Sequence, residues 1–177
     1  MDGDDKLYLG YSDIHRTVKQ LSVELGRSGY EPEVMVAIGT GGFIPARILK
    51  TFTGLPILTV GIRYYTEENK PLPRPRTIQW IDEVEKKLAG KRVLLVDEVD
   101  DSRVTLSYCL RELLRHEPEE IGVMVLHNKR KTKRDVLPPQ VRHYFVGREV
   151  ADIWISYPWD AQDIDEHEAL AAAASGS

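Results

Sequence analysis

Cysteine is almost absent from this chain: only Cys109 occurs among its 177 residues. A single cysteine cannot form an internal disulfide or a cysteine-rich metal site, and this favours a reducing compartment, so we expect a cytoplasmic protein. The sequence also lacks the apolar run of a signal peptide and any stretch of about 20 apolar residues that could cross a bilayer. We therefore expect no membrane partner.

A strong excess of one charge is also absent. The 24 basic and 28 acidic residues give a formal net charge of -4, so we expect no general attraction to nucleic acid and no nucleic-acid partner. Hydrophobic residues make up 42% of the chain and charged residues 29%, which excludes a disordered or fibrous protein. This length suits one core, so 1–177 is predicted to be a single domain.

Short apolar runs alternate with amphipathic helical patterns along the chain. The runs predicted as strands are 34–38, 57–62, 92–96 and 122–126. The first helix is predicted to begin with Ser12 or Asp13 as its N-cap and to stop at Gly26 and Gly29. Alternating strands and helices require crossover connections, so the sequence predicts an α/β fold, an open and mainly parallel sheet flanked by helices. Ligands of such sheets bind beyond the carboxyl ends of the strands.

Residues 64–88 interrupt this alternation. They contain Pro71, Pro73 and Pro75 and show little periodicity, so we expect a flexible flap in this segment. Strand patterns return near 144–146 and 153–155, and the end of the chain, residues 171–177, is expected to be a frayed tail.

Four acids follow the apolar run 92–96 directly: Asp97, Glu98, Asp100 and Asp101. Carboxylates this close repel one another, and that cost favours a functional reason. Ser102 and Thr105 come next, at the predicted start of a helix, where hydroxyl and free N–H groups bind phosphate. Together these features suit a sugar phosphate. The alternative is an acidic helix start with Asp100 or Asp101 as the N-cap, which would explain only one or two of the acids.

Three further segments are candidates for ligand binding. The turn 39–42 lets the main chain approach an anion, although its composition fits a simple tight turn equally well, and it lacks the lysine of a nucleotide P-loop. The basic run 129–134, taken alone, is typical of a solvated face or an RNA-binding patch. Residues 152–160 contain Trp154 and Trp159, and two aromatic side chains this close can simply be part of a core.

The acidic motif resembles the signature of the type I phosphoribosyltransferases. In that signature an apolar strand is followed by two acids, two further residues, an acid, a hydroxyl residue, usually glycine, any residue and threonine. Residues 97–105 match it, except that Arg103 replaces the usual glycine. The segments 37–49, 76–82 and 96–101 are most similar to the 6-oxopurine branch, and within it to the fungal hypoxanthine-guanine enzymes, which also tolerate arginine at this place. We therefore expect a changed loop shape and retained activity.

The resemblance covers about residues 11–163 and implies roles for the acidic and glycine segments. Asp97 and Glu98 would hold the ribose hydroxyls, directly or through Mg²⁺, and Asp101 would be the catalytic base or acceptor at purine N7. The loop that would bind the ribose and its 5-phosphate also includes Ser102, Arg103, Val104 and Thr105. The pyrophosphate loop would be formed by Thr40, Gly41 and Gly42, with Lys133 as a further contact.

The resemblance also implies a purine site in a small hood made of residues 127–163 and the N-terminal residues. The purine-binding residues would be Lys129, Trp154, Ile155, Trp159 and Asp160. Lys129 would donate to the purine O6 and so favour a 6-oxo over a 6-amino group, and Trp154 would stack on the base. Asp160, with Asp97 and Glu98, would lie near the metal, through water where not directly. Tyr64 and Tyr65 would begin the flap that closes over the site.

The implied activity is transfer of 5-phosphoribosyl from its diphosphate (PRPP) to N9 of hypoxanthine, guanine or xanthine, by a homodimer or homotetramer that uses Mg²⁺. One alternative is a phosphoribosyltransferase for another base, against which Lys129 and Trp154 argue. The other is a non-catalytic regulator that binds PRPP. The complete set of acids argues against that regulator, whereas the basic run keeps it open.

Overall fold

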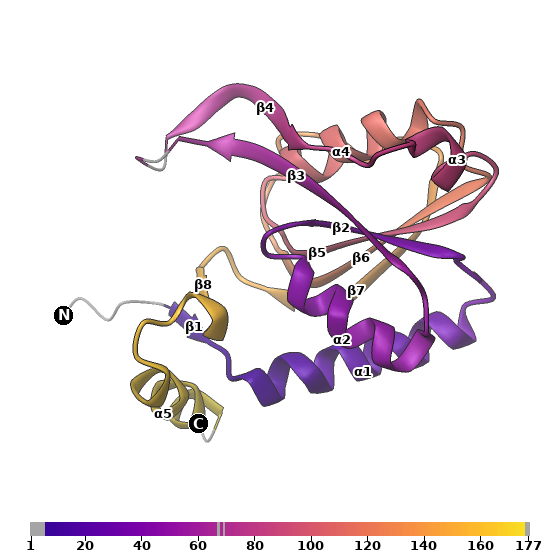
Figure 1. The fold of residues 1–177 in the computed structure, drawn as a ribbon. Coiled ribbons are helices and arrows are strands. Elements are labelled where there is room, and N and C mark those ends of the chain that lie inside the picture. The colour runs from indigo at the N-terminus through magenta and orange to yellow at the C-terminus, as the bar shows by residue number, and fades with distance from the viewer. Residues whose placement is uncertain (1–5, 67, 69, 176–177) are drawn as a thin grey trace.

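A six-stranded sheet forms the centre of the computed structural model, which describes residues 6–66, 68 and 70–175 (Figure 1). Its strand order is β4-β3-β2-β5-β6-β7. In that order the strands are Pro71–Gln79, Ile57–Tyr65, Val34–Gly39, Arg92–Asp100, Glu120–Lys129 and Val141–Val150. All neighbouring strands pair in parallel except β3 and β4. The predicted mainly parallel α/β sheet is therefore confirmed.

Helices cover both faces of this sheet (Figure 1). They are α1 (Tyr11–Arg27) and α2 (Phe43–Thr53) on one face, and α3 (Val84–Leu88) and α4 (Val104–Leu114) on the other. Strand β2 shows why both faces are apolar: Met35 and Ala37 pack towards α1 and α2, while Val36 and Ile38 pack into the opposite core. Alternating side chains of a buried parallel strand require apolar neighbours on both sides.

The first helix begins earlier than the sequence predicts. Its N-cap is Gly10, and the Gly10 N–H donates to the Asp13 carboxylate over 3.0 Å. Asp13 therefore lies within the first turn and reaches back towards the cap, so neither it nor Ser12 is the cap. The helix continues through Gly26 to Arg27. Within the described residues, no helix has the length and apolar character needed to cross a membrane.

Residues 64–88 are more regular than expected. Strand β3 extends through Tyr65, and β4 returns beside it as the antiparallel edge of the sheet. Pro71, Pro73 and Pro75 occupy every second position in the first half of β4. An edge strand uses only every second N–H in its single ladder, so alternating prolines are tolerated there. The prolines conceal this strand in the sequence because they usually argue against one.

A smaller two-stranded sheet lies beside the main one (Figure 1). Its strands, β1 (Lys6–Tyr8) and β8 (Trp154–Ser156), pair in parallel, with Leu7 opposite Ile155. The 3₁₀ helix η1 (Pro158–Asp160) follows β8. The first and the last strand of the described chain therefore pair with each other.

The last helix, α5 (Ile164–Ser175), corrects the expectation of a frayed tail for residues 171–175. Ala171 is buried, and residues 176 and 177 lie outside the described part of the chain. His167 hydrogen-bonds the carbonyl of Leu9 over 2.9 Å, and the Tyr11 N–H donates to Glu168 over 3.0 Å. These bonds order the end of the chain because they fasten α5 to the segment that follows β1.

The turn between β2 and α2 generates a stability prediction. A Cβ at Gly42 would lie 2.6 Å from the Val96 carbonyl oxygen and 2.7 Å from that of Ile38, and these main-chain atoms cannot move aside cheaply. Gly42→Ala should therefore lower the free energy of unfolding by about 1–3 kcal/mol, as overpacking does. Urea unfolding would measure it. The control is Gly26→Ala in α1, where nothing lies within 4 Å of the added carbon; equal stability of both variants would contradict the close approach at Gly42.

Candidate functional site

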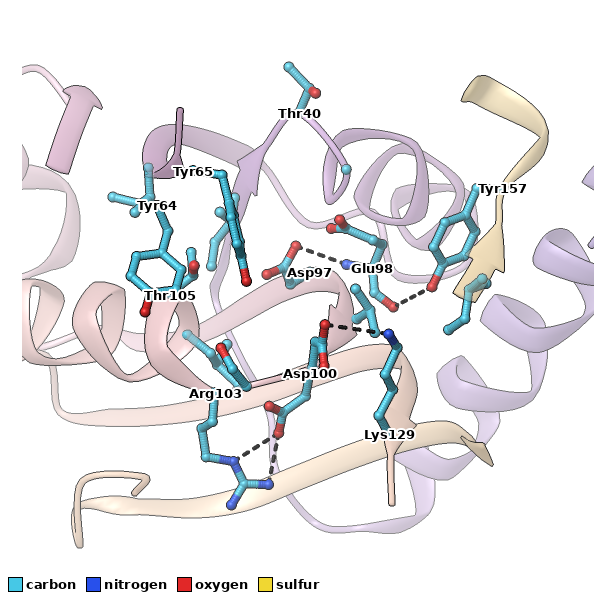
Figure 2. Close-up of a pocket in the computed structure, with 18 of the residues that line it drawn as sticks. Thr40, Tyr64, Tyr65, Asp97, Glu98, Asp100, Arg103, Thr105, Lys129 and Tyr157 are labelled. Carbon is cyan, nitrogen blue, oxygen red and sulfur yellow. Dashed lines mark hydrogen bonds and ion pairs between the residues drawn. The ribbon is translucent and has the colours of Figure 1, made fainter. Parts of the chain in front are cut away.

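A cavity of about 550 Å³ opens at the carboxyl ends of the central strands (Figure 2). It lies between β2 and β5, where the strand order changes direction: the strand after β2 in the sequence, β3, lies on one side, and the strand after β5, β6, lies on the other. Open α/β sheets bind ligands at this position. The predicted site residues that line it are Thr40, Gly41, Tyr64, Tyr65, Asp97, Glu98, Asp101, Ser102, Arg103, Thr105, Lys129, Trp154, Ile155 and Asp160. Residues from five separate segments of the chain therefore meet in one pocket.

Four predicted site residues, Gly42, Val104, Trp159 and Lys133, do not line this pocket. Gly42 packs against main-chain atoms of β2 and β5, and Val104 is the first residue of α4. The Trp159 ring stacks on Tyr157, with ring centroids 4.5 Å apart, and packs against the core beside α1 and α2. For Trp159 the packing alternative therefore describes the side chain.

Asp100 is the most buried of the four acids, and its contacts hold the loop between β5 and α4 in place. Its Oδ2 accepts from Arg103 Nε over 2.9 Å, from Arg103 Nη2 over 2.8 Å and from the Tyr144 hydroxyl over 2.6 Å. Lys133 Nζ lies 3.6 Å from Oδ1. A buried carboxylate needs such partners because desolvation is costly. Asp100 is thus an internal anchor rather than the N-cap of α4.

Arg103 occupies the glycine position of the family signature and is the N-cap of α4. Its φ of 70° is the left-handed conformation that glycine adopts readily and other residues rarely do. The guanidinium is held by Asp100 and lies 5.6 Å from the Tyr144 ring centroid. These contacts offset the strain, and they turn the charged group away from the cavity (Figure 2).

Lys133 supports the same loop from the other side. Its Nζ donates to the carbonyl oxygens of Asp100 over 2.7 Å, Asp101 over 2.9 Å and Lys129 over 2.9 Å. An ammonium group has only three hydrogens to donate. The expectation that Lys133 contacts pyrophosphate is therefore wrong for this structure, because all three donors are used within the protein.

Asp97 and Glu98 bring two carboxylates to the floor of the cavity. Burial, and then the charges of Glu98 and Asp100, raise the pKa of Asp97 well above its ordinary value. The Glu98 N–H donates to Asp97 Oδ1 over 2.9 Å. A Cβ at Gly41 would collide with the Glu98 carboxylate, so the glycine turn lies directly against the acids. A cation or a set of hydroxyl donors would stabilise this crowded pair.

A buried chain of hydrogen bonds behind Glu98 fixes its main chain. The Tyr157 hydroxyl donates to the Glu98 carbonyl over 3.2 Å and lies 2.8 Å from His127 Nδ1. Burial, with a smaller contribution from Arg148, lowers the pKa of His127 to about 4, so the ring is neutral at pH 7. Neither residue was predicted from the sequence: Tyr157 lies within the segment 152–160 but was not singled out there, and the signal for His127 was a polar residue within the apolar strand β6.

Asp101 follows β5 directly and lies between two lysines. Its Oδ2 lies 3.4 Å from Lys129 Nζ and its Oδ1 lies 2.9 Å from Lys131 Nζ. Burial acts to raise the pKa of Asp101, but the hydrogen bonds and charges of Lys131 and Lys129 outweigh it and hold that pKa below its ordinary value. Asp101 is therefore ionised at neutral pH. Lys131 was not singled out from the basic run, although its place two residues after Lys129 was a signal.

The wall of the cavity formed by β8 is more apolar than the wall formed by the acids that end and follow β5. Trp154 is 61% exposed although it lines the pocket, and a large exposed ring at a cavity suits a flat ligand. Ile155, next to it, is buried. Burial raises the pKa of Asp160, and His167 partly opposes that shift. One wall of the cavity is therefore acidic and the other aromatic.

Comparison with known proteins agrees with this geometry. The phosphoribosyl transferase domain matches residues 10–161. The hypoxanthine-guanine phosphoribosyltransferase of Schizosaccharomyces pombe is 39% identical over 94% of this chain and 95% of its own. Xanthine phosphoribosyltransferase 1 of Saccharomyces cerevisiae is 34% identical over 98% of each chain.

Solved structures show the same relationship. A hypothetical protein from Neisseria gonorrhoeae, crystallised with bound ppGpp, has a TM-score of 0.90 and 46% identity, covering 98% of this chain and 99% of its own. A purine phosphoribosyltransferase from Pyrococcus horikoshii has a TM-score of 0.70 and 27% identity, covering 90% of this chain and 97% of its own. The chain therefore belongs to the phosphoribosyltransferase family and has the type I fold of its purine branch.

Proposed function

We propose that this protein transfers the 5-phosphoribosyl group of PRPP to N9 of a 6-oxopurine, namely hypoxanthine, guanine or xanthine, and releases pyrophosphate. The observation that carries this proposal is the meeting of the β5 acids and the start of α4 with Lys129 and Trp154 in one cavity. The names of the curated relatives support the choice of base. The Neisseria protein was crystallised with ppGpp, a ligand that carries a guanine base and phosphate groups, and this supports a ligand with a purine and a phosphate for this chain.

The sugar-phosphate half of the substrate suits the loop between β5 and α4. Ser102 and Thr105 bring hydroxyl groups, and the first turn of α4 brings free N–H groups and the positive end of its dipole. Asp97 and Glu98 would accept hydrogen bonds from the ribose hydroxyls. As the bond at the anomeric carbon breaks, positive charge develops on the ribose, and these carboxylates stabilise that charge.

The base suits the opposite wall. The Lys129 ammonium and the Asp101 carboxylate lie 3.4 Å apart, and O6 and N7 are neighbours on one edge of a purine. Lys129 would donate to O6, and Asp101 would take the proton at N7. Trp154 would stack on the ring, while main-chain groups of Ile155 and near Trp159, with Asp160, would contact its far edge.

Magnesium fits the acids at the cavity floor. Within the described residues no three metal-binding side chains form a cluster, yet Mg²⁺ commonly takes only one or two protein carboxylates and completes its shell with substrate oxygens and water. The crowded Asp97 and Glu98 would supply these carboxylates, and Asp160 would take part through water. The bound ion would neutralise charge on the pyrophosphate leaving group.

The β3–β4 hairpin would act as the flap of this site. Tyr64 and Tyr65 line the cavity from the end of β3, and closure over the ribose would exclude water that could otherwise hydrolyse it. The proposal also includes a homodimer or homotetramer, as the family resemblance implies. It places the protein in the cytoplasm, which suits a single, buried cysteine.

The proposal is tested by one assay of several bases. The protein is incubated with PRPP, Mg²⁺ and either hypoxanthine, guanine, xanthine, adenine or uracil, and nucleotide formation is followed by chromatography. Turnover should occur with one or more of the three 6-oxopurines and not with adenine. Turnover with uracil or adenine alone would indicate another base, and binding of PRPP without turnover on any base would indicate a regulator.

The role of Asp101 gives a second prediction. Asp101→Asn should lower kcat by about 100-fold or more, a usual contribution of an acid or base, because the amide cannot take the N7 proton. The KM for PRPP should change little. Glu24→Gln removes one exposed carboxylate from α1 and should keep the wild-type rate. A wild-type kcat in Asp101→Asn would remove this residue from the mechanism.

Trp154 gives a third prediction. Trp154→Ala should raise the KM for the purine by about tenfold, since stacking of an aromatic side chain on a base is worth about 1–3 kcal/mol. Trp154→Phe keeps an aromatic face and should restore most of the affinity. Steady-state kinetics over a range of purine concentrations provide the measurement. If the KM of the alanine variant equals that of the wild type, the ring serves packing only.

A further inference from the structure

Lys131 connects two parts of the cavity that are distant in the sequence. Its Nζ lies 2.9 Å from Asp101 Oδ1 and 2.9 Å from Asp152 Oδ1. Asp101 is the last of the four acids and follows β5 directly, whereas Asp152 lies between β7 and β8, two residues before Trp154. The three side chains, named here the Lys131 bridge, therefore join the expected proton acceptor to the segment that carries the stacking ring.

The bridge matters because a bound purine would compete with Asp101 for the Lys129 ammonium group. In the structure Lys129 lies 3.4 Å from Asp101 Oδ2 and 4.0 Å from Asp152 Oδ1. A purine whose O6 accepts from Lys129 would draw that ammonium group away from Asp101. Lys131 forms an ion pair with the other oxygen of Asp101, so the carboxylate would retain one positive neighbour when the base arrives.

We propose that Lys131 is a positioning residue, which keeps Asp101 ionised and oriented towards N7 while Lys129 binds the purine O6, and that Asp152 holds Lys131 in this place. The catalytic part of this inference rests on the proposed function. Lys131 contacts the carboxylate and not the reacting atoms, so its effect passes through Asp101.

The charges around Asp101 determine the sign of the effect. It is faced by Lys129 at the end of β6, by Lys131 in the following loop and by Tyr65 at the end of β3, while Lys133 donates to its main-chain oxygen. Asp152 places a further negative charge beside the two lysines. Burial, and then the negative charge of Asp101, raise the pKa of Tyr65, so this hydroxyl is neutral and supplies no positive charge.

Removing Lys131 would therefore raise the pKa of Asp101. The ionised form accepts the proton, so activity is lost as the pH falls through this pKa. In Lys131→Met the acid limb of the kcat/KM profile should lie at higher pH than in the wild type. The kcat should fall by about tenfold, a part of the 100-fold or more expected for the base itself, while the KM for PRPP should stay within about twofold because Lys131 is not expected to contact phosphate.

Two further variants separate the bridge from a general loss of charge. Lys131→Arg keeps a cation between the two carboxylates and should restore the wild-type acid limb. Arg130→Met removes an exposed neighbouring cation and should leave the profile unchanged. An acid limb in Lys131→Met that coincides with that of the wild type would overturn the proposal, as would a tenfold rise in the KM for PRPP without movement of the limb.

A measurement without substrate separates failure of this inference from failure of the proposed function. The Asp101 carboxyl carbon is labelled with ¹³C, assigned with Asp101→Asn, and titrated by NMR in the free protein. Its pKa should be higher in Lys131→Met than in the wild type, whether or not any purine turns over. An equal pKa in the two proteins would show that Lys131 does not control Asp101, even if the assay detects nucleotide.

Discussion

The buried carboxylate of Asp100 is the interaction on which the site depends. It receives two nitrogens of Arg103 and the hydroxyl of Tyr144, and Lys133 lies beside it while binding three neighbouring carbonyls. Breaking one such buried pair leaves an uncompensated charge. These contacts fix the turn from β5 into α4, so that Asp97, Glu98 and Asp101 are held at set positions around the cavity.

The contacts around Asp100 also give neighbouring acids of this segment different environments. Asp100 faces inward and supports the loop, Asp97 is crowded by neighbouring negative charge, and Asp101 is balanced by two lysines. The pKa values of Asp97 and Asp101 are therefore shifted in opposite directions, although only three residues separate the two side chains. This follows from where β5 leaves the sheet, since each successive residue meets a different environment.

Much of this organisation could be predicted from the sequence. Apolar runs such as 34–38 and 92–96 mark strands buried on both faces, so the parallel sheet and the location of its ligand site follow from periodicity. Edge strand β4 could not be predicted, because its prolines fit an edge ladder only once its neighbour is known. The inward direction of Asp100 and the pairing of Lys131 with Asp152 also escape the sequence, since loops without periodicity bring these residues together.

The pairing of β1 with β8 makes the two sides of the cavity differ in how far along the chain their supports lie. Ile155, on the base side of the cavity, lies opposite Leu7, and α5 fastens the segment after β1 through Leu9 and Tyr11. The acidic side is carried by central strands of the main sheet. The base side instead rests on contacts between segments about 150 residues apart in the sequence, so changes near either terminus would reach the base side first.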